Sequence, residues 1–322
     1  MNALVLQEKG KALDYKKVVT PVATEQEGIV AVKAAALNHR DVWITKGLYP
    51  GITYPIILGS DGCGIYEGQE VILNPNIDWG DKEAYQSARY HILGLPTHGT
   101  FAEYVKVGKD KIHPKPAHLT MEEAAALPLS GLTAYRALFT KCQLKAGEKV
   151  LISGVGGGVA LFACQFAIAA GAEVYVSSSD NDKIAKAVSM GAVAGGNYRM
   201  ADWTKGLKAK AGGFDVVIDS AAGDGFKDLV KMCNPGGRIA FYGGTRGKIT
   251  ALNPQLIFWK QLSLYGTTMG SDREFSEMLA FVEQHKIVPV VDTVYKLAEG
   301  NAAFKKMDQA LQFGKLVLSI GG

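Results

Sequence analysis

A glycine-rich turn between an apolar strand and an apolar helix constrains the fold of this 322-residue chain more than any other feature. The strand KVLISG runs directly into GVGGGVALF, and a second strand, EVYVSSS, follows the helix. Glycines at such a turn allow a pyrophosphate to approach the backbone and to rest on the helix N–H groups. The spacing is GxxGxxA, and the alternative is a turn that needs glycine for its backbone alone. The order of elements favours a dinucleotide site, with cofactor contacts expected from Gly154, Gly156, Gly157, Gly158 and Val159.

The pattern of elements along the chain predicts an α/β protein with two domains. Up to about residue 115, short β-rich runs such as GIVAVKAAAL and QEVIL are broken by Gly, Pro and Asp, which is typical of an antiparallel barrel or sandwich. Helix signals begin at Leu119, with Thr120 as N-cap and Glu123 completing a capping box. Strands and helices then alternate, which predicts a parallel, doubly wound Rossmann sheet. We expect part of the C-terminal tail to return to the first domain.

The end of the second strand of the parallel sheet indicates which nucleotide binds. NAD sites usually place a carboxylate there for the ribose 2′-hydroxyl, whereas NADP sites lack that charge and supply a cation. Here the strand ends in Ser177, Ser178 and Ser179, followed by Lys183. Asp180 and Asp182 stand at the start of a helix, where they serve as cap and first-turn residues. We therefore predict NADP, with Ser178, Ser179 and Lys183 as contacts; the alternative for Lys183 is a solvated helix lysine.

Composition and charge exclude several classes of partner. The net charge of +4 is spread thinly and no run of Lys or Arg marks a nucleic-acid or lipid surface, so a small molecule is the expected partner. The apolar tract from Val159 is too short and too interrupted to span a bilayer, and we expect a cytoplasmic protein. The four cysteines are far apart and lack a CxxC pair, which indicates reduced thiols.

Several motifs together resemble the medium-chain dehydrogenase/reductase superfamily, and within it the zinc-independent quinone oxidoreductase-like branch. They are ALNHRD, GLYPG, LGSDGCG, GTFAEYV, EEAAALPLSGLTAY, the glycine turn and GKLVLSI. The resemblance implies a GroES-like catalytic domain from residues 1–118 and 267–322, with a Rossmann nucleotide-binding domain from 119–266. It also implies a homodimer. Relatives usually carry a longer connection after the GSDG turn, where this chain passes directly from GIYEG to QEVIL.

The resemblance also bears on whether the protein holds a metal. The catalytic zinc ligands of the zinc-dependent relatives correspond to Asn38, Ser60 and Leu129, none of which is a good zinc ligand. The cysteines of their structural zinc lobe are missing as well. An alternative set of His39, Asp61 and Cys63 matches no known spacing of a metal site. The sequence therefore predicts no metal.

A protein of this kind without a metal suits only some oxidoreductions. No Lewis acid is available to polarise a simple carbonyl, and none of the 13 tyrosines has a Lys four residues on to replace it. Hydride transfer from NADPH to a quinone or an α,β-unsaturated carbonyl remains feasible, because the negative charge forms on a remote oxygen that hydrogen-bond donors can stabilise. The alternatives are an alcohol or aldehyde dehydrogenase that uses a side-chain acid, and a weakly catalytic NADPH-binding sensor or scaffold.

By resemblance, specific residues belong to the reaction site and the cofactor site. Asn38 and Asp41 are expected beside the nicotinamide, Asn38 as an oxyanion donor or as an amide bracing its loop, and Asp41 mainly orienting neighbours such as Arg40. Ser60 is a further catalytic candidate, or else a turn former. The acceptor pocket is expected to include Trp43 and Tyr49. The remaining expected cofactor contacts are Thr133, Tyr198, Tyr242, Gly243, Gly244, Thr267, Thr268 and Lys315, the last near the phosphates or else a strand-edge lysine.

Overall fold

A computed structural model describes residues 1–321 and divides the chain into two compact units. The first unit contains Met1–Leu132 and the chain from Gly270 onward, and the second contains Thr133–Met269. The boundaries expected from the resemblance lie at 118/119 and 266/267, and α2 (Met121–Ala126), which follows the first of them, packs on the strands of the first unit. Within residues 1–321 no helix is long and apolar enough to cross a membrane.

The first unit is built mainly from antiparallel strands. Its seven-stranded sheet has the order β10-β6-β5-β3-β18-β17, with β9 also paired to β3, and a three-stranded sheet has the order β2-β1-β4. The strands of these sheets are β1 (Asn2–Leu6), β2 (Asp14–Lys17), β3 (Glu27–Ala36), β4 (Ile56–Ile57), β5 (Asp61–Tyr66), β6 (Gln69–Leu73), β9 (Tyr104–Gly108), β10 (Ile112–Pro114), β17 (Val291–Lys296) and β18 (Lys315–Ser319). A separate two-stranded ladder pairs β7 (Asn76–Ile77) with β8 (His91–Ile92). The fold of this unit is the predicted GroES-like, β-rich one.

Burial along β3 explains why this strand leads to a polar site. Its first six residues alternate between partly buried and buried, as expected for a strand with one face on the core, and its last three residues, Ala34 to Ala36, are all buried. The chain then continues through Leu37 and Asn38, both buried, into α1 (His39–Thr45). Small side chains at the end of β3 therefore let neighbouring strands approach the point where the strand becomes a helix.

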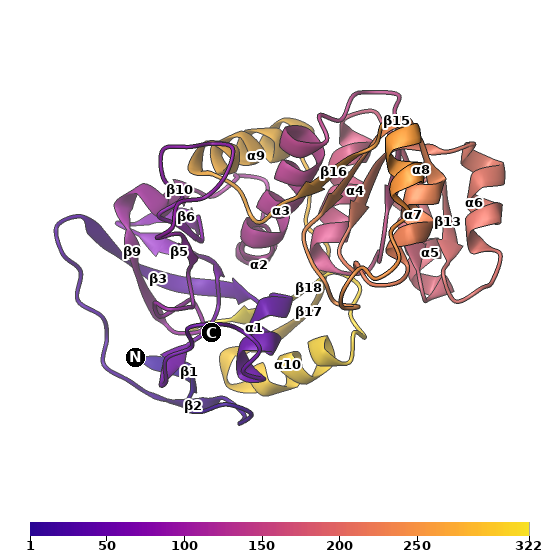
Figure 1. Cartoon of the computed structure of the whole chain (residues 1–322). Coiled ribbons are helices and arrows are strands. Elements are labelled where there is room, and N and C mark those ends of the chain that lie inside the picture. The colour runs from indigo at the N-terminus through magenta and orange to yellow at the C-terminus, as the bar shows by residue number, and fades with distance from the viewer. Residues whose placement is uncertain (322) are drawn as a thin grey trace. The chain divides into compact units, whose positions relative to one another are not determined.

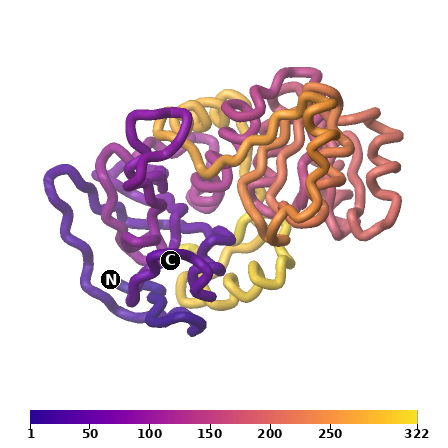
Figure 2. Tube along the Cα trace, viewed as in Figure 1, coloured from indigo at the N-terminus to yellow at the C-terminus, as the bar shows by residue number. Residues whose placement is uncertain are grey.

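The C-terminal tail returns to the first unit, as the sequence predicted. β18 pairs antiparallel with β3, with Val317 opposite Ala36, and the N–H of Leu37 donates to the carbonyl of Leu316 at 2.9 Å. Figure 2 shows the yellow C-terminal trace beside the purple trace of β3. The helices of this unit are α1, α2, the start of α3 (Pro128–Tyr135), α9 (Asp272–His285) and α10 (Gly300–Asp308), with short 3-10 turns at Lys109–Lys111 and Leu297–Glu299.

The direct connection from GIYEG to QEVIL is a tight two-residue turn between β5 and β6. Tyr66 pairs with Gln69, and the two residues between them, Glu67 and Gly68, both have positive φ, at 48° and 79°. Two successive positive φ values define the type I′ turn whose twist matches that of paired strands. The connection is therefore a regular hairpin.

The second unit is a parallel sheet with helical connections, as predicted. Its six strands have the order β13-β12-β11-β14-β15-β16, and every neighbouring pair is parallel. The strands are β11 (Lys149–Ile152), β12 (Glu173–Ser178), β13 (Ala194–Asn197), β14 (Phe214–Asp219), β15 (Cys233–Phe241) and β16 (Ser263–Gly266). The connecting helices in Figure 1 are α4 (Gly158–Ala169), α5 (Asn181–Ser189), α6 (Trp203–Ala211), α7 (Phe226–Met232) and α8 (Pro254–Trp259), and a π-helical turn at Arg136–Lys141 follows α3. The strand order reverses after β11, so the fold is doubly wound.

Candidate active site and cofactor site

Four polar side chains of the first unit form one buried cluster, which we call the buried polar cluster. It consists of Asn38, Asp61, Ser130 and Lys315, each at most 5% exposed. The ammonium of Lys315 lies 2.9 Å from Asp61 Oδ2, 2.7 Å from Asn38 Oδ1 and 3.4 Å from Ser130 Oγ. Asn38 Nδ2 donates to Asp61 Oδ2 at 2.9 Å, and the Ser130 hydroxyl donates to Asn38 Oδ1 at 3.1 Å. Each member is thus bonded to at least two others.

Four separate segments bring these side chains together. Asn38 lies between β3 and α1, Asp61 begins β5, Lys315 begins β18 and Ser130 lies on α3. β5 and β18 both pair with the end of β3, so the register of the sheet sets Asp61 and Lys315 beside Asn38. The second oxygen of Asp61 accepts the N–H of Leu129 at 2.8 Å. A buried ion pair is tolerated only when further hydrogen bonds of this kind satisfy its remaining atoms.

The cluster changes the role expected of Lys315. Its ammonium is 3% exposed and has acceptors for three donated hydrogens, all within the first unit. In this arrangement it is a buried ion-pair partner rather than a strand-edge lysine. The alternative of a strand-edge lysine is wrong, because β18 lies between β3 and β17 in the sheet. The expected contact of Lys315 with the cofactor phosphates stays a prediction.

Asn38 braces its surroundings, which is one of the two roles that the sequence left open, and the oxyanion-donor role stays a prediction. Its carbonyl oxygen accepts from Lys315 and Ser130, and one hydrogen of its amide nitrogen goes to Asp61. These contacts fix the orientation of the amide, with Oδ1 toward Lys315 and Ser130 and Nδ2 toward Asp61. Asn38 therefore braces the side chains around it. The other hydrogen on Nδ2 has no such partner within residues 1–321 and is the donor that an oxyanion could use.

Asp41 is fully buried and helps to start α1. Its Oδ2 accepts the N–H of Asn38 at 2.8 Å, as in a capping box, whereas its Oδ1 has no partner in the described part of the chain. Burial raises the pKa of Asp41 to about 6, although the Arg40 guanidinium and the hydrogen bond from Asn38 act in the opposite direction. A buried carboxyl group with a pKa shifted in this way is a candidate for a functional site.

Arg40, Ser60 and Tyr49 form a second arrangement next to the cluster. Arg40 Nη1 donates to Ser60 Oγ at 2.7 Å and to the carbonyl of Leu93 at 3.1 Å, and the Ser60 hydroxyl donates to the same carbonyl at 2.8 Å. The guanidinium carbon lies 5.4 Å from the centre of the Tyr49 ring. Ser60 therefore anchors Arg40, a residue whose importance the sequence understated. Trp43, which is half-buried, packs edge-on against His39 at 5.4 Å.

In the second unit, the glycine turn has the geometry that the sequence predicted. Gly154 and Gly156 have φ values of 70° and 120°, which residues with a Cβ rarely adopt. Gly157 caps α4, and Gly158 and Val159 form its first turn, where N–H groups lack partners within the helix. Asp219, at the end of β14, accepts from the Ser153 hydroxyl and from the N–H of Ala222 and so braces this edge. Asp219 could have been found from the sequence by its position at the end of the apolar strand DVVID.

The other predicted cofactor residues gather at the carboxyl ends of the parallel strands, where open α/β sheets bind ligands. Ser178 ends β12 and Ser179 follows it, Tyr198 follows β13, and Tyr242 follows β15 with Gly243 and Gly244. A Cβ on Gly243 would lie 2.6 Å from the carbonyl oxygen of Ser220, so only glycine fits there. Thr267 and Thr268 follow β16, and Thr133 is buried at the start of the second unit.

The acidic residue after β12 is committed to its own helix. Asp180 Oδ1 accepts the N–H groups of Asp182 and Lys183 at 2.8 Å and 3.4 Å, as an N-cap does, which confirms the predicted cap. The capping box of Thr120 with Glu123 is confirmed in the same way. Lys183 lies over the glycine turn, because a Cβ built on Gly156 would be 2.7 Å from Lys183 Cδ.

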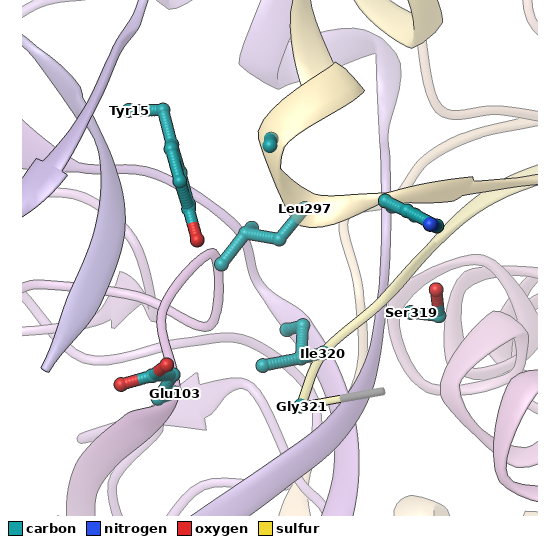
Figure 3. Close-up of a pocket in the computed structure, with 8 residues that line it drawn as sticks. Tyr15, Glu103, Leu297, Ser319, Ile320 and Gly321 are labelled. Atoms are coloured by element: carbon teal, nitrogen blue, oxygen red, sulfur yellow. The ribbon is translucent and has the colours of Figure 1, made fainter.

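A further pocket lies elsewhere in the first unit and has a different character. It is lined by Tyr15, Glu103, Leu297, Ser319, Ile320 and Gly321, among others (Figure 3). None of its lining residues belongs to the predicted site. We assign no part of the chemistry to it.

Comparison with known proteins places this geometry in a family. Residues 24–117 match the alcohol dehydrogenase GroES-like domain, and residues 158–284 match the zinc-binding dehydrogenase family. A zinc-type alcohol dehydrogenase-like protein of Leptosphaeria maculans is 36% identical, over 96% of this chain and 94% of that protein. The quinone oxidoreductase of Mus musculus is 29% identical, over 94% and 91% of the two chains. The chain belongs to the medium-chain dehydrogenase/reductase superfamily, in its quinone oxidoreductase-like branch. It is accordingly an oxidoreductase that uses a nicotinamide cofactor.

Solved structures of this superfamily have the same fold but differ in their cofactors. A crystal structure described as an NAD-dependent alcohol dehydrogenase matches with a TM-score of 0.95 at 36% identity, covering 100% of both chains. The quinone oxidoreductase of Thermus thermophilus, described with its NADPH complex, matches with a TM-score of 0.84 at 29% identity, covering 99% and 100%.

The name of the family that residues 158–284 match implies zinc. The residues of this chain at the expected ligand positions do not fit that metal. The carbonyl oxygen of Asn38 and the carboxylate of Asp61 face an ammonium, and a metal ion there would meet that positive charge. Leu129 offers only its N–H, which donates to Asp61. In the alternative set, burial raises the pKa of Cys63 to about 12, so the thiol stays protonated, and its sulfur lies 3.4 Å from Met121 Sδ.

Proposed function

We propose that the protein is a metal-free reductase that transfers a hydride from NADPH to a quinone or an α,β-unsaturated carbonyl compound. The observation that carries this proposal is the ammonium of Lys315 against Asn38 and Asp61, where the zinc-dependent members of the superfamily have their metal-ligand region. An internal cation at this place supports chemistry that does not need a Lewis acid. Quinones and conjugated carbonyls meet that condition, because they are already electron-poor.

The residues of the buried polar cluster suit this reaction. When bound, the reduced nicotinamide supplies the hydride, which adds to the electron-poor carbon while the electron pair moves to the substrate oxygen. The remaining N–H of Asn38 Nδ2 is held in a fixed direction by three neighbours and can stabilise the charge on that oxygen. Solvent or a protonated side chain then supplies the proton to the product.

Several relatives support the proposed class of acceptor. Quinone oxidoreductases of mouse, rat and Pseudomonas aeruginosa match over most of the chain, at 28 to 29% identity. The crotonyl-CoA carboxylase/reductase of Cereibacter sphaeroides matches at 27% identity over 93% of this chain, and its name describes a conjugated thioester substrate.

The choice of NADPH is supported by the end of β12. Hydroxyl groups of Ser178 and Ser179 and the ammonium of Lys183 lie in this region, and the carboxylate of Asp180 is engaged by the start of α5. A 2′-phosphate therefore meets donors and a cation there rather than a free carboxylate. Because one structural relative is described as NAD-dependent, the affinities for NADPH and NADH have to be compared by measurement.

The test is a panel of acceptors followed by the consumption of NADPH or NADH. We expect turnover of quinones, enones and alkenals with NADPH, unchanged by a chelator and by added zinc. A second candidate, an alcohol or aldehyde dehydrogenase, is favoured by the names of the Leptosphaeria relative and of the NAD-dependent structure. Turnover of unactivated aldehydes at rates similar to those of enones, or loss of activity on chelation, would establish that candidate instead.

We also propose that the protein acts as a cytoplasmic homodimer. The cytoplasmic location is supported by four cysteines that are all buried and free of disulfides. The dimer is supported by β16, which has a neighbour on one side only, and by Phe258 and Trp259 on α8, which are 65% and 83% exposed. Open strand edges and large exposed aromatic side chains are typical of interfaces. Sedimentation equilibrium of the wild type and of Trp259→Ser tests this: a monomeric wild type contradicts it.

A further inference from the structure

Arg246, in the loop after β15, reaches the part of the second unit where the phosphorylated ribose is expected. Tyr198 follows β13, and its N–H donates to the carbonyl of Ser178 at 3.0 Å, so this residue is attached to the end of β12. The guanidinium carbon of Arg246 lies 5.1 Å from the centre of the Tyr198 ring. Arg246 itself belongs to the loop after β15, which is separated from β13 by three strands of the sheet.

The loop that carries Arg246 is held by its backbone. The N–H of Arg246 donates to the carbonyl of Ala221 at 2.9 Å, and the N–H of Gly223 donates to the carbonyl of Gly247 at 3.1 Å. A third bond, from Gly247 to the carbonyl of Gly244 at 3.0 Å, closes a turn within the loop. The loop is thus fixed to the segment after β14, and this attachment supports the reach of Arg246 across the carboxyl ends of the strands.

The stacking on Tyr198 leaves the donors of Arg246 available. An arginine stacked on a ring uses the face of its guanidinium, whereas its N–H groups point outward in the plane. Arg246 is exposed, and no ion pair between it and a carboxylate occurs within residues 1–321. Asp180, at the start of α5, accepts from the backbone of that helix. The guanidinium therefore lies over the Tyr198 ring, and no carboxylate of residues 1–321 neutralises its charge.

We propose that Arg246 is a specificity residue that binds the 2′-phosphate of NADPH, as a second cation beside Lys183. The inference rests on the proposed function, because it assumes that the phosphorylated cofactor is the natural one. A guanidinium matches phosphate oxygens with two parallel N–H groups, and such charge-assisted bonds are stronger than neutral ones. NADH presents only a hydroxyl at the same place, so the contact discriminates between the two cofactors.

The experiment compares binding of NADPH and NADH to the full-length wild type and to Arg246→Gln, Arg246→Lys and Lys227→Gln. Lys227 is an exposed lysine on α7, so its substitution changes the net charge equally at a place without a proposed role. Fluorescence titration should show that Arg246→Gln weakens NADPH binding about tenfold and NADH binding less than about twofold. Arg246→Lys should retain part of the preference, and Lys227→Gln should retain all of it.

A second pair of ligands separates the phosphate from the rest of the cofactor. Adenosine 2′,5′-bisphosphate and adenosine 5′-monophosphate lack the nicotinamide, so only the 2′-phosphate distinguishes them. Calorimetry should show that Arg246→Gln weakens the bisphosphate selectively. Equal weakening of both compounds would mean that Arg246 stacks on the adenine, and no weakening would mean that it is a solvated arginine. Either result overturns the inference.

The outcomes also distinguish this inference from the proposed function. If the wild type binds NADH more tightly than NADPH, the proposed cofactor is wrong and the role of Arg246 is wrong with it. If the wild type prefers NADPH, and Arg246→Gln leaves the preference unchanged, the proposed cofactor stands and only the role of Arg246 is rejected. Thermal denaturation of each variant confirms that an altered ratio does not come from misfolding.

Discussion

The two groups of polar side chains in this protein differ in what neutralises their charges. In the buried polar cluster of the first unit, Lys315 is paired with Asp61, and amide and hydroxyl groups satisfy the remaining atoms. At the carboxyl ends of the parallel strands in the second unit, Arg246 is exposed and lacks a described carboxylate partner. The first group balances its charges internally and fixes geometry, with one hydrogen of Asn38 Nδ2 left over. The second becomes complete only with an anion, as a cofactor site should.

The largest expected effect comes from breaking the buried pair. Lys315→Met leaves the carboxylate of Asp61 buried without its cation, which should lower the free energy of unfolding by about 3–5 kcal/mol. The matched substitution in the second unit, Lys183→Met, should change it by less than about 0.5 kcal/mol, because that lysine is only partly buried on a helix. Urea denaturation followed by circular dichroism measures both.

The double variant Asp61→Asn with Lys315→Met shows whether the unpaired charge of Asp61 causes the loss of stability in Lys315→Met. It removes both ions and should recover at least half of the stability that the single variant loses, since neutral groups have no large desolvation cost. A double variant that is no more stable than Lys315→Met would mean that shape, and not charge balance, holds this site together.

A smaller effect is expected from the pH dependence of Asp41. Burial raises its pKa from 3.8 to about 6 in the folded protein, so the folded state binds a proton more tightly than the unfolded state. Stability therefore falls as the pH rises through this window and stays lower above it. The difference between the two pKa values corresponds to on the order of 3 kcal/mol.

Asp41→Asn tests this sign directly. The amide oxygen can still accept the N–H of Asn38, but the side chain no longer ionises. We expect the variant to be more stable than the wild type by about 1–3 kcal/mol at pH 8, and the difference to disappear below about pH 4. Unfolding measured between pH 4 and pH 8 decides it. A variant that is less stable at pH 8 would show that the charge of Asp41 is needed, most directly by Arg40.

The comparison of the two groups also explains what the sequence could predict. The glycine turn, the parallel sheet and the caps at Thr120 and Asp180 depend on residues close together in the chain, and all were predicted. Asp61 and Lys315 are 254 residues apart, and their pairing depends on the register of β18 and β5 against β3. No local pattern contains that register. For the same reason the anchoring of Arg40 by Ser60 and the contact of Arg246 with Tyr198 emerged only from the structure.

The smallest expected effect tests whether the cofactor turn is preformed. Gly156 has a φ of 120°, and a Cβ there would meet the side chain of Lys183 at 2.7 Å. Gly156→Ala should therefore lower stability by about 1–2 kcal/mol through backbone strain, and it should weaken the binding of NADPH more than that of NADH by displacing Lys183. Denaturation and cofactor titration measure the two effects separately.

Gly206 provides the matched control, because the same substitution there should have the opposite sign. It lies within α6, where an added Cβ meets nothing within 4 Å and φ is not positive. Gly206→Ala should therefore stabilise the protein by roughly 0.5–1 kcal/mol, since alanine restricts the unfolded chain and favours the helix. If Gly156→Ala were as stable as Gly206→Ala, the turn would relax without the cofactor. The second group would then lack a fixed geometry as well as a neutralising partner.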